Sequence, residues 1–472
     1  MSFNLVRNSR VFLTTNVNAF GVVQTTGLLP ANTYELQVLD GFSFSQNTQS
    51  ETVTLNEAGE APVRGQRSFN TSLDPVDFTF STYMRPRVDG GVVTAEESVL
   101  WNAIAGAGAL GNATLTGGTF GGITRTLATD STAVITMTGV TATNLVIGNI
   151  YTVSGVTGTH PDEWNTAVRV TAIDLGADTI TVSYLTAPAQ AAGTTSGPSA
   201  TNFALSTGSW ASNPNSALVH FGGSNKHQLQ TFGMVFVVDG IAYAVDNAAM
   251  DQASIDFGLD AIAMVAWTGK GTQLRQLAAT AVTTGATPAF SGGLTGTATG
   301  KNTTAPYIAN KLSTMKLISN IGGLSGTAYN VAITGGNLTI ANNLTYLTPA
   351  NLGTVNVPIT YFTGTRAISG NVTAYLRGGA GNTTAALLSS MLAAASSSVD
   401  PKYFLQIEVG GGANAVHVEL EMNSAMLTIP TVNVEQVVST QITFTAQGAA
   451  ADFSDYDIAN TNELSIRYYA AA

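Results

Sequence analysis

The chain has 472 residues and a net charge of −11, and only 10% of its residues are charged. It has no cysteine, which excludes disulfides and thiolate metal sites. The lack of a basic block argues against tight phosphate binding, and the 44% hydrophobic content exceeds that of disordered chains. A chain of this length has room for two or three domains with cores of their own.

Two segments bear on the cellular location of the protein. Residues 1–10 (MSFNLVRNSR) have no long apolar core, so no signal peptide is expected. The apolar run at 261–267 is too short to span a bilayer. We therefore expect synthesis and assembly in a cytoplasm, without a membrane partner.

The first part of the chain predicts strands followed by one helix. Apolar and polar residues alternate at 9–17, at 34–44 around a glycine turn, and at 78–85. A helix is expected from about Thr94 to Ile104. Thr94 suits the N-cap position, and Glu97 three residues later completes a capping box.

The middle of the chain predicts a small β-domain inserted after this helix, at 113–210. Residues 145–154, 167–173 and 179–184 alternate as strands do, which is typical of an Ig-like sandwich or a small barrel. Residues 187–198 (APAQAAGTTSGP) are interpreted as its exit linker.

The remainder of the chain repeats the first part in the same order. The matched pairs are 9–17 with 313–321, 34–44 with 329–340, 78–85 with 370–377, 242–245 with 425–429, and 262–269 with 439–446. Each match is weak, but chance rarely preserves the order of five matches, so we infer an internal duplication.

The duplication defines the predicted domains. One copy is discontinuous and comprises 1–112 with 211–300, and the other comprises 301–472. A Gly-, Thr- and Ala-rich linker at 279–304 joins them. The second copy has its own helix from about Thr383, with Leu388 and Leu392 on one face.

Two glycine-rich motifs do not predict a nucleotide site. Gly106, Gly108 and Gly111 fit GxGxxG, but a dinucleotide motif must follow a strand and open a helix, whereas this one follows a helix. We interpret it as a helix C-cap and flexible exit. Residues 269–272 (GKGT) lack the Walker spacing and are interpreted as a hairpin turn at the end of a strand.

Histidines and carboxylates give no metal or catalytic pattern. The residues considered are His160, His220, His227, His417, Asp256, Asp260, Asp452, Asp455 and Asp457. No histidine pair has the i, i+4 spacing of a helical zinc site, although His220 and His227 flank a turn. The three aspartates near residue 455 lack the EF-hand pattern and favour an acidic surface loop.

Catalysis has no positive support from the sequence. Asp256 and Asp260 could mimic a glycosidase carboxylate pair, but solvated or interface carboxylates are favoured in a chain so poor in charge. A GxSxG nucleophile elbow is absent. We predict no enzymatic activity, no cofactor and no metal.

The order of elements in each half resembles the tail tube fold of tailed phages and related contractile injection systems. The segments that carry the resemblance are 34–44, 78–87, the helix near Thr94, and 255–271. The resemblance implies a mainly β chain of two tandem tail-tube-like sandwich or barrel domains, each with one flanking helix, plus the inserted β-domain. It also implies that residues 51–74 form the long loop that reaches a neighbouring subunit.

The resemblance further implies a virion structural protein of the tail tube, assembled in the cytoplasm of the host bacterium. Tube rings of this family contain six copies of the one-domain fold, so three duplicated chains are expected to form one ring. The implied partners are other copies of the chain, the tape measure protein, the tail terminator and distal tail proteins. Viral DNA is expected to pass through the lumen during ejection without tight binding.

Two other classes of function remain open on the sequence. Another virion structural protein, such as a capsid decoration protein or a fibre, is one, although a fibre predicts short-period repeats that are not seen. A carbohydrate-binding or carbohydrate-active β-protein is the other, although the four tryptophans are spread singly. An outer inserted domain favours a non-contractile tail, because a sheath would compete for that surface.

Overall fold

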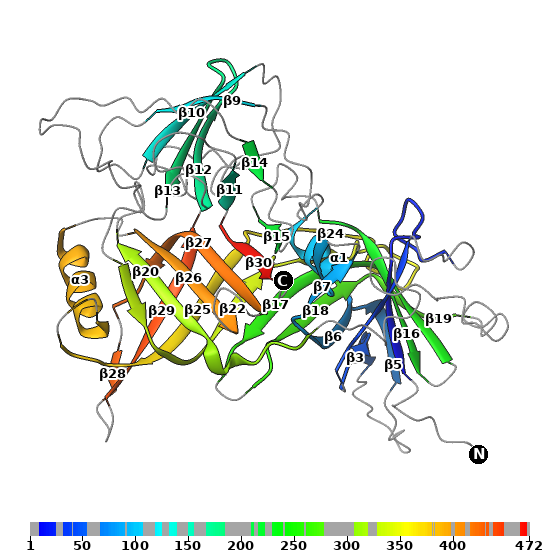
Figure 1. The fold of residues 1–472 in the computed structure, drawn as a ribbon. Coiled ribbons are helices and arrows are strands. Elements are labelled where there is room, and N and C mark those ends of the chain that lie inside the picture. The colour runs from blue at the N-terminus through cyan, green and yellow to red at the C-terminus, as the bar shows by residue number, and fades with distance from the viewer. Residues whose placement is uncertain are drawn as a thin grey trace, which may run out of the picture.

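The computed structural model describes most of the chain. The described residues are 9–24, 32–39, 41–53, 67–89, 92–106, 119–124, 132–138, 150–154, 167–184, 209–211, 216–221, 229–238, 241–258, 261–277, 306–319, 328–379, 381, 383–397, 402–410, 416–429, 431–433, 438–447 and 463–469. The fold is mainly β, as the sequence predicts, and its strand pairs are antiparallel apart from one isolated bridge (Figure 1).

The first half of the chain forms a curved sheet. Its strands are β1 (Arg10–Thr14), β2 (Thr33–Leu36), β3 (Ser43–Ser45), β6 (Val76–Tyr83), β16 (Phe232–Val238), β17 (Ile241–Asp256), β18 (Met264–Gly271) and β19 (Gln273–Leu277). The order of neighbours is β2-β1-β16-β17-β18-β6-β3, and β19 pairs with the first part of β17. Alternating burial in β6 shows the period of two that its sequence predicts.

The second half repeats this order strand for strand. Its strands are β20 (Thr314–Ser319), β21 (Ala328–Val331), β22 (Ile333–Ala341), β25 (Ala367–Tyr375), β26 (Lys402–Gly410), β27 (His417–Leu427), β29 (Ser439–Gln447) and β30 (Ser465–Tyr469). Neighbours follow the order β21-β20-β26-β27-β29-β25-β22, and β30 pairs with the first part of β27. The predicted duplication is confirmed at the level of strand order.

The remaining elements extend from these two sheets. They are the pairs β4 (Thr48–Val53) with β5 (Arg67–Leu73), β7 (Pro86–Asp89) with β8 (Val92–Ala95), and β23 (Thr345–Leu347) with β24 (Thr360–Phe362), the strands β15 (Ser216–His220) and β28 (Thr431–Asn433), the 3-10 turn Asn310–Leu312, and the helices α1 (Ser98–Ala105) and α3 (Thr384–Ser397). Among the described residues, no helix is both long and apolar enough to cross a membrane.

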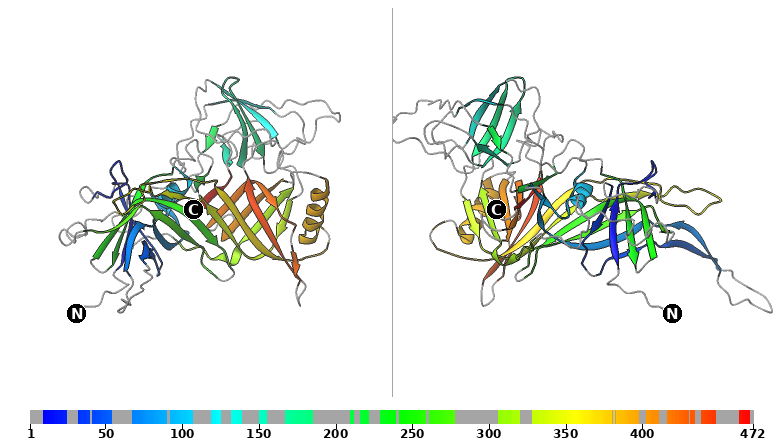
Figure 2. Two further views of the ribbon diagram at one scale, coloured as in Figure 1. Left: turned by 180° about the vertical axis from the view of Figure 1, so that it is seen from behind. Right: turned by 45° about the vertical axis from the view of Figure 1, so that its right-hand side comes forward.

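The inserted segment forms a separate sheet above the large one (Figures 1 and 2). It contains β9 (Thr119–Thr124), β10 (Thr132–Thr138), β11 (Ile150–Ser154), β12 (Ala167–Asp174), β13 (Thr179–Tyr184) and β14 (Ser209–Ala211), in the order β14-β11-β12-β13-β10-β9. Residues 167–173 and 179–184 lie in strands as predicted, and the described part of 145–154 does too. Both predicted linkers, 187–198 and 279–304, lie outside the described residues.

One hydrophobic core joins the two halves. The buried cluster contains residues of both, among them Trp101 of α1, Trp267 of β18 and Tyr468 of β30. The Trp101 indole N–H donates to the Tyr468 hydroxyl at 2.7 Å, and the rings of Trp101 and Trp267 lie 4.7 Å apart. Because Tyr468 comes from β30 and both tryptophans come from the first half, the last strand and the first half of the chain depend on each other for burial.

A complementary pair of residues lies at matching positions in the two halves. In the first half Phe78 of β6 lies opposite Gly269 of β18, and in the second half Gly370 of β25 lies opposite Phe444 of β29. A Cβ on Gly269 would lie 2.2 Å from the Phe78 ring, and one on Gly370 would lie 2.6 Å from the Phe444 ring. Each half therefore holds one phenyl ring over one glycine, with the two strands exchanged.

The predicted hairpin turn at 269–272 is wrong, because residues 269–271 lie within an extended strand. Residues 264–277 form an almost continuous strand, β18 and β19, which bends only at Thr272. The glycines in it allow close packing, since a Cβ on Gly271 would lie 2.2 Å from Val245. The glycines at 335–336 likewise lie inside β22 rather than in a turn.

The first predicted helix begins later than expected. Thr94 lies in β8 opposite Arg87, and α1 begins at Ser98 without a side-chain cap. The capping box is wrong because the Glu97 carboxylate accepts hydrogen bonds from the Tyr468 hydroxyl and from the Arg85 backbone N–H. The second helix agrees with its prediction, and the Thr383 hydroxyl accepts a hydrogen bond from the Ala386 N–H at 3.4 Å.

Strand pairing also corrects two of the sequence matches. The match of 262–269 with 439–446 is shifted by two residues, because Gly269 lies opposite Phe78 and its equivalent, Phe444, lies opposite Gly370. The match of 242–245 with 425–429 is displaced further. Residues 242–245 pair with β16 and β19, whereas 425–427 pair with β26 and β29. The two segments lie on equivalent strands, β17 and β27, but at different points along them. The register shifts directly after Phe232 in the first half and directly after Tyr403 in the second, so these two residues are equivalent. Ala248 pairs with Phe232 and Ala425 pairs with Tyr403, so Ala425 matches Ala248.

Candidate assembly interface

The two halves are joined edge to edge by backbone pairing. The last part of β17 pairs with β22, so that Ser254 lies opposite Thr339, Ile255 opposite Leu338 and Asp256 opposite Asn337. The hydroxyls of Ser254 and Thr339 lie 3.4 Å apart, and Ile255 and Leu338 are fully buried. We call this pairing the seam. It makes one sheet of the two halves, visible at the centre of Figure 1.

A two-stranded arm of the second half, β23 with β24, lies over the first half next to the seam. The Tyr346 hydroxyl contacts the carbonyls of Asn247 at 2.9 Å and Lys270 at 2.8 Å, and Tyr361 donates to the Leu229 carbonyl at 3.2 Å. Burial raises the pKa of Tyr346 well above its ordinary value. This arm covers Ala249 of β17, which is fully buried together with Leu229 and Leu344.

Asn342, which precedes β23, anchors the start of the arm β23–β24 to the first half. The side-chain N–H₂ of buried Asn342 donates to the carbonyls of Ile104 at 2.9 Å and Met250 at 3.2 Å. The Leu344 N–H donates to the Asp251 carboxylate at 2.8 Å. A buried polar side chain without hydrogen-bond partners destabilises the fold. Asn342 finds its partners only in this position, so these bonds hold the start of the arm in place.

The corresponding arm of the first half, β4 with β5, extends from the molecule and is largely exposed. It covers part of the predicted long loop 51–74, whose tip lies outside the described residues. Among the described residues the two arms meet at Asn356, whose carbonyl accepts the Leu73 N–H at 2.8 Å and whose N–H donates to the Thr71 carbonyl at 3.1 Å. Each half therefore carries an arm at the same place in its strand order, after β3 or after β22.

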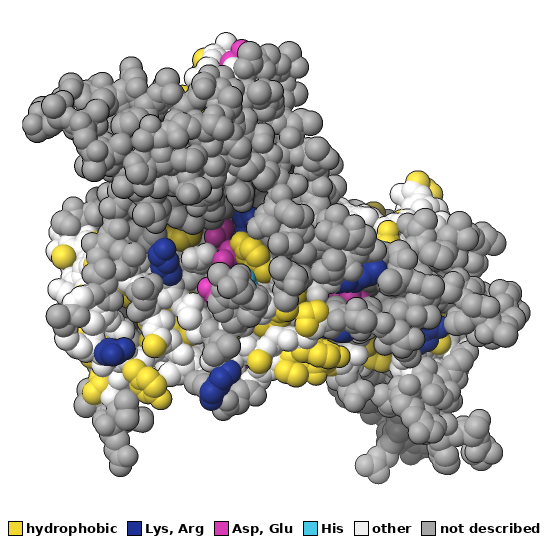
Figure 3. Space-filling view, in the orientation of Figure 1, with side chains coloured by type: hydrophobic (Ala, Val, Ile, Leu, Met, Phe, Trp, Pro, Cys, Tyr) yellow, Lys and Arg dark blue, Asp and Glu magenta, His cyan; other side chains and the backbone are white. Residues whose placement is uncertain are grey.

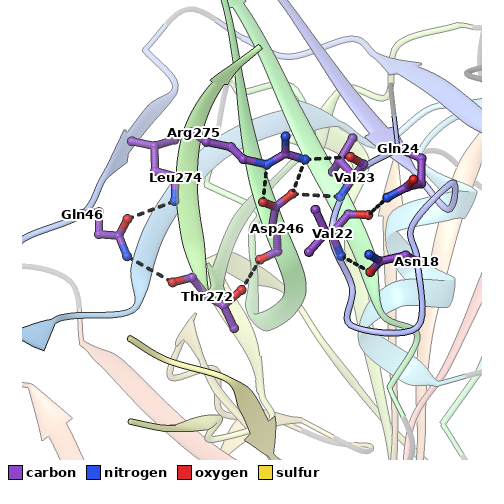
Figure 4. Close-up of polar contacts among 9 residues, drawn as sticks. All are labelled: Asn18, Val22, Val23, Gln24, Gln46, Asp246, Thr272, Leu274 and Arg275. Atoms are coloured by element: carbon purple, nitrogen blue, oxygen red, sulfur yellow. Dashed lines mark hydrogen bonds and ion pairs between the residues drawn. The ribbon is translucent and has the colours of Figure 1, made fainter. Parts of the chain in front are cut away.

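A partly buried ion pair holds the loop after β1 against this region (Figure 4). Arg275 of β19 donates to the Asp246 carboxylate at 2.5 Å and to the Val23 carbonyl at 2.6 Å. The same carboxylate accepts the Val23 N–H at 2.8 Å, and only 2% of the Asp246 side chain is exposed. Gln46, next to β3, bonds to the Thr272 carbonyl and the Leu274 N–H.

We expect Asp246→Ala to lower stability by about 2–4 kcal/mol, because it leaves the Arg275 cation and the Val23 N–H without their acceptor. Asp246→Asn should cost less, since its carbonyl oxygen can still accept the Val23 N–H. Midpoints of thermal unfolding test this, with Asp256→Asn, an exposed aspartate on the same strand, as the matched control. Equal midpoints for D246A and D256N would contradict the prediction.

The candidate residues from the sequence do not form a chemical site. Gly106 caps the end of α1 as predicted, and Asp256 is exposed at the end of β17. His417 is buried and stacks on Tyr469 with centroids 4.3 Å apart. His220 lies in β15, but its side chain is not among those described. The others lie outside the described residues, namely His160, His227, Asp260, Asp452, Asp455 and Asp457.

Where side chains are described, no three His, Cys, Asp or Glu residues gather closely enough to hold a metal ion. The features that the fold does position are a seam, two arms and a duplicated strand order, which define a mainly β protein whose two equivalent sheets are joined edge to edge within one chain. The sequence predicted the arm region, but it gave no sign of the seam, because pairing between distant strands leaves no local pattern.

Comparison with known proteins agrees with this class. No known family model matches the chain. The chain is similar to the tail tube protein pb6 of Escherichia phage T5, with 25% identity over 461 residues, which cover 96% of this chain and 75% of that protein. The resemblance to phage tail tube proteins that the sequence suggests is confirmed, and the similarity supports a structural role in a phage tail.

Proposed function

We propose that this protein forms the tail tube of a phage virion as stacked rings through which DNA is ejected. The observation that carries the proposal is the seam: two copies of one fold already associate edge to edge within a single chain. Similarity to a tail tube protein over nearly the whole chain supports the same function. The tape measure protein, the tail terminator and distal tail proteins would be its partners.

The ring would contain three chains. Each chain supplies two equivalent folds, and the six folds of a tube ring are therefore reached with three chains. Contacts between chains would be head-to-tail, because an isologous contact closes a dimer and cannot generate a ring of three. The covalent link makes every second contact intramolecular, which favours closure.

The surface charge supports a lumen that does not retain DNA. The net charge is −11, and on the face drawn in Figure 3 the described charged side chains are few and scattered among hydrophobic ones. A wall without basic clusters makes few phosphate contacts, so DNA can slide along it.

The inserted sheet would lie on the outer surface of the tube as a domain of its own, at 113–210. It forms a separate sheet in which Ile135, Val168 and Val182 are buried. In the lumen it would obstruct the channel, and between rings it would prevent stacking. An outer position fits a non-contractile tail better than a sheathed one.

A carbohydrate-binding function is less well supported than the tube. Sugar sites in proteins expose aromatic rings, whereas the two tryptophans whose side chains are described, Trp101 and Trp267, are fully buried. A capsid decoration protein or a fibre does not account for a duplicated fold that already joins edge to edge.

Electron cryo-microscopy of the purified, assembled protein tests the proposal. We expect tubes whose rings contain three chains with pseudo-sixfold symmetry, an outer inserted sheet and a lumen with more acidic than basic side chains. Dispersed monomers would overturn the tube assignment. Six chains per ring would leave the tube but refute the ring number, and a lumenal inserted sheet would refute its placement.

A further inference from the structure

The two strand edges that form the seam have counterparts elsewhere in the molecule, one in the second half and one in the first. In the second half the strand equivalent to β17 is split into β27 and β28. Thr431, Val432 and Asn433 of β28 pair with Gln441, Thr440 and Ser439 of β29. In the first half Ser254, Ile255 and Asp256 of β17 pair with Ala266, Val265 and Met264 of β18.

Register on the neighbouring strands shows which residues correspond. Val265 pairs with Thr82 of β6, and Thr440 pairs with Ala374 of β25. These two pairs occupy equivalent positions, because each lies four residues along from the matched phenyl–glycine pairs. Val432 therefore corresponds to Ile255, Thr431 to Ser254 and Asn433 to Asp256. Strand β28 is thus the counterpart of the part of β17 that forms the seam.

The opposite side of the seam also has a counterpart. Asn337, Leu338 and Thr339 of β22 pair with Asn371, Gly370 and Ser369 of β25. Ser43, Phe44 and Ser45 of β3 pair with Thr79, Phe78 and Asp77 of β6. Since Gly370 corresponds to Phe78, Phe44 corresponds to Leu338, and β3 is the first-half equivalent of the seam strand β22.

Within the described part of the chain, β3 pairs only with β6 and β28 only with β29. Figures 1 and 2 show these two strands at opposite ends of the molecule. An open strand edge is a template for another chain. Because the edges lie far apart within one molecule and form a complementary pair, they fit two different copies.

We propose that β28 of one copy pairs antiparallel with β3 of the next copy, with Thr431 opposite Ser45, Val432 opposite Phe44 and Asn433 opposite Ser43. The pairing repeats the register of the internal seam. It rests on the proposed function, and it identifies the surface by which one chain binds the next in a ring.

An exposed side chain beside β28 supports the same partner. Met426 of β27 pairs with Lys402 next to the Tyr403–Ala425 pair, so it corresponds to Ala249 of β17. The arm β23–β24 buries Ala249 completely, whereas Met426 is 44% exposed. The arm β4–β5 of the next copy follows β3 as β23–β24 follows β22, and it would cover Met426 in the same way.

Cysteine cross-linking in this cysteine-free chain tests the register directly. Ser45→Cys combined with Thr431→Cys places two thiols at directly opposed positions, within the Cα separation that disulfides require. Ser254→Cys with Thr339→Cys provides the internal reference, and should give an intramolecular disulfide. Ser45→Cys with Val432→Cys is the matched control, because adjacent residues of a strand point to opposite faces of the sheet.

After mild oxidation of assembled protein, we expect S45C/T431C to give covalent species of up to three chains on a non-reducing gel. The S45C/V432C variant and both single variants should stay monomeric. Tubes of S45C/T431C that form normally under reducing conditions but do not cross-link on oxidation would overturn the pairing and leave the proposed function intact. Failure of the unmodified protein to assemble would overturn both.

Discussion

Exchanging Phe78 and Gly269 should restore most of the stability that either change alone removes. Phe78→Gly leaves a cavity next to the rings of Phe80 and Phe236 and should cost about 4 kcal/mol or more. Gly269→Phe overfills the same space, since even a Cβ would lie 2.2 Å from the existing ring, and should cost several kcal/mol. The double variant recreates the arrangement that Gly370 and Phe444 already have in the second half.

Thermal unfolding of the two single variants, the double variant and the parent protein measures this coupling. Gly378→Ala is the control for adding a side chain, because a Cβ there would have no neighbour within 4 Å. If the double variant is no more stable than the less stable single variant, the phenyl–glycine pair cannot be exchanged between the strands of the first half, which would contradict the prediction.

Stability should fall as the pH rises from about 4.5 to about 7, because of Glu97. Burial raises the pKa of this carboxyl from 4.5 to about 7, and the adjacent Glu96 carboxylate adds to the effect. The hydrogen bonds from Tyr468 and from the Arg85 backbone oppose it. In this pH range the folded protein binds a proton that the unfolded chain has released, so the free energy of unfolding decreases as pH increases.

The size of the effect is about 3 kcal/mol between the ends of the range, and no further loss from this group is expected above pH 7. Glu97→Gln removes the titrating group and should flatten the dependence, making the variant more stable than the parent at pH 8. Chemical unfolding at several pH values measures it, with the exposed Glu51→Gln as the control. A parent and an E97Q variant with parallel pH profiles would refute the assignment.

Features with a local signal were predictable from the sequence. Alternation located most strands of both halves, and the order of the matches was enough to detect the duplication. The fold class and the second helix follow from patterns that neighbouring residues set by themselves. The match between 78–85 and 370–377 agrees with the strand register, although one segment has a phenylalanine where the other has a glycine.

Features that depend on distant partners were not predictable. Thr94 and Glu97 fit a capping box, but Glu97 bonds to Tyr468, which follows it by 371 residues. Gly269 looked like a turn residue because its partner Phe78 lies on another strand. The seam depends on two strand edges whose sequences contain nothing that identifies them as partners.

The two halves differ where β18 continues into β19. In the first half a single residue, Thr272, separates the strands, whereas in the second half residues 448–464 lie between β29 and β30 and include Asp452, Asp455 and Asp457. In a ring of three chains, rotation by one sixth of a turn therefore superposes unlike folds. Successive rings would have three equivalent azimuths rather than six, and a protein that binds the end of the tube would meet threefold symmetry.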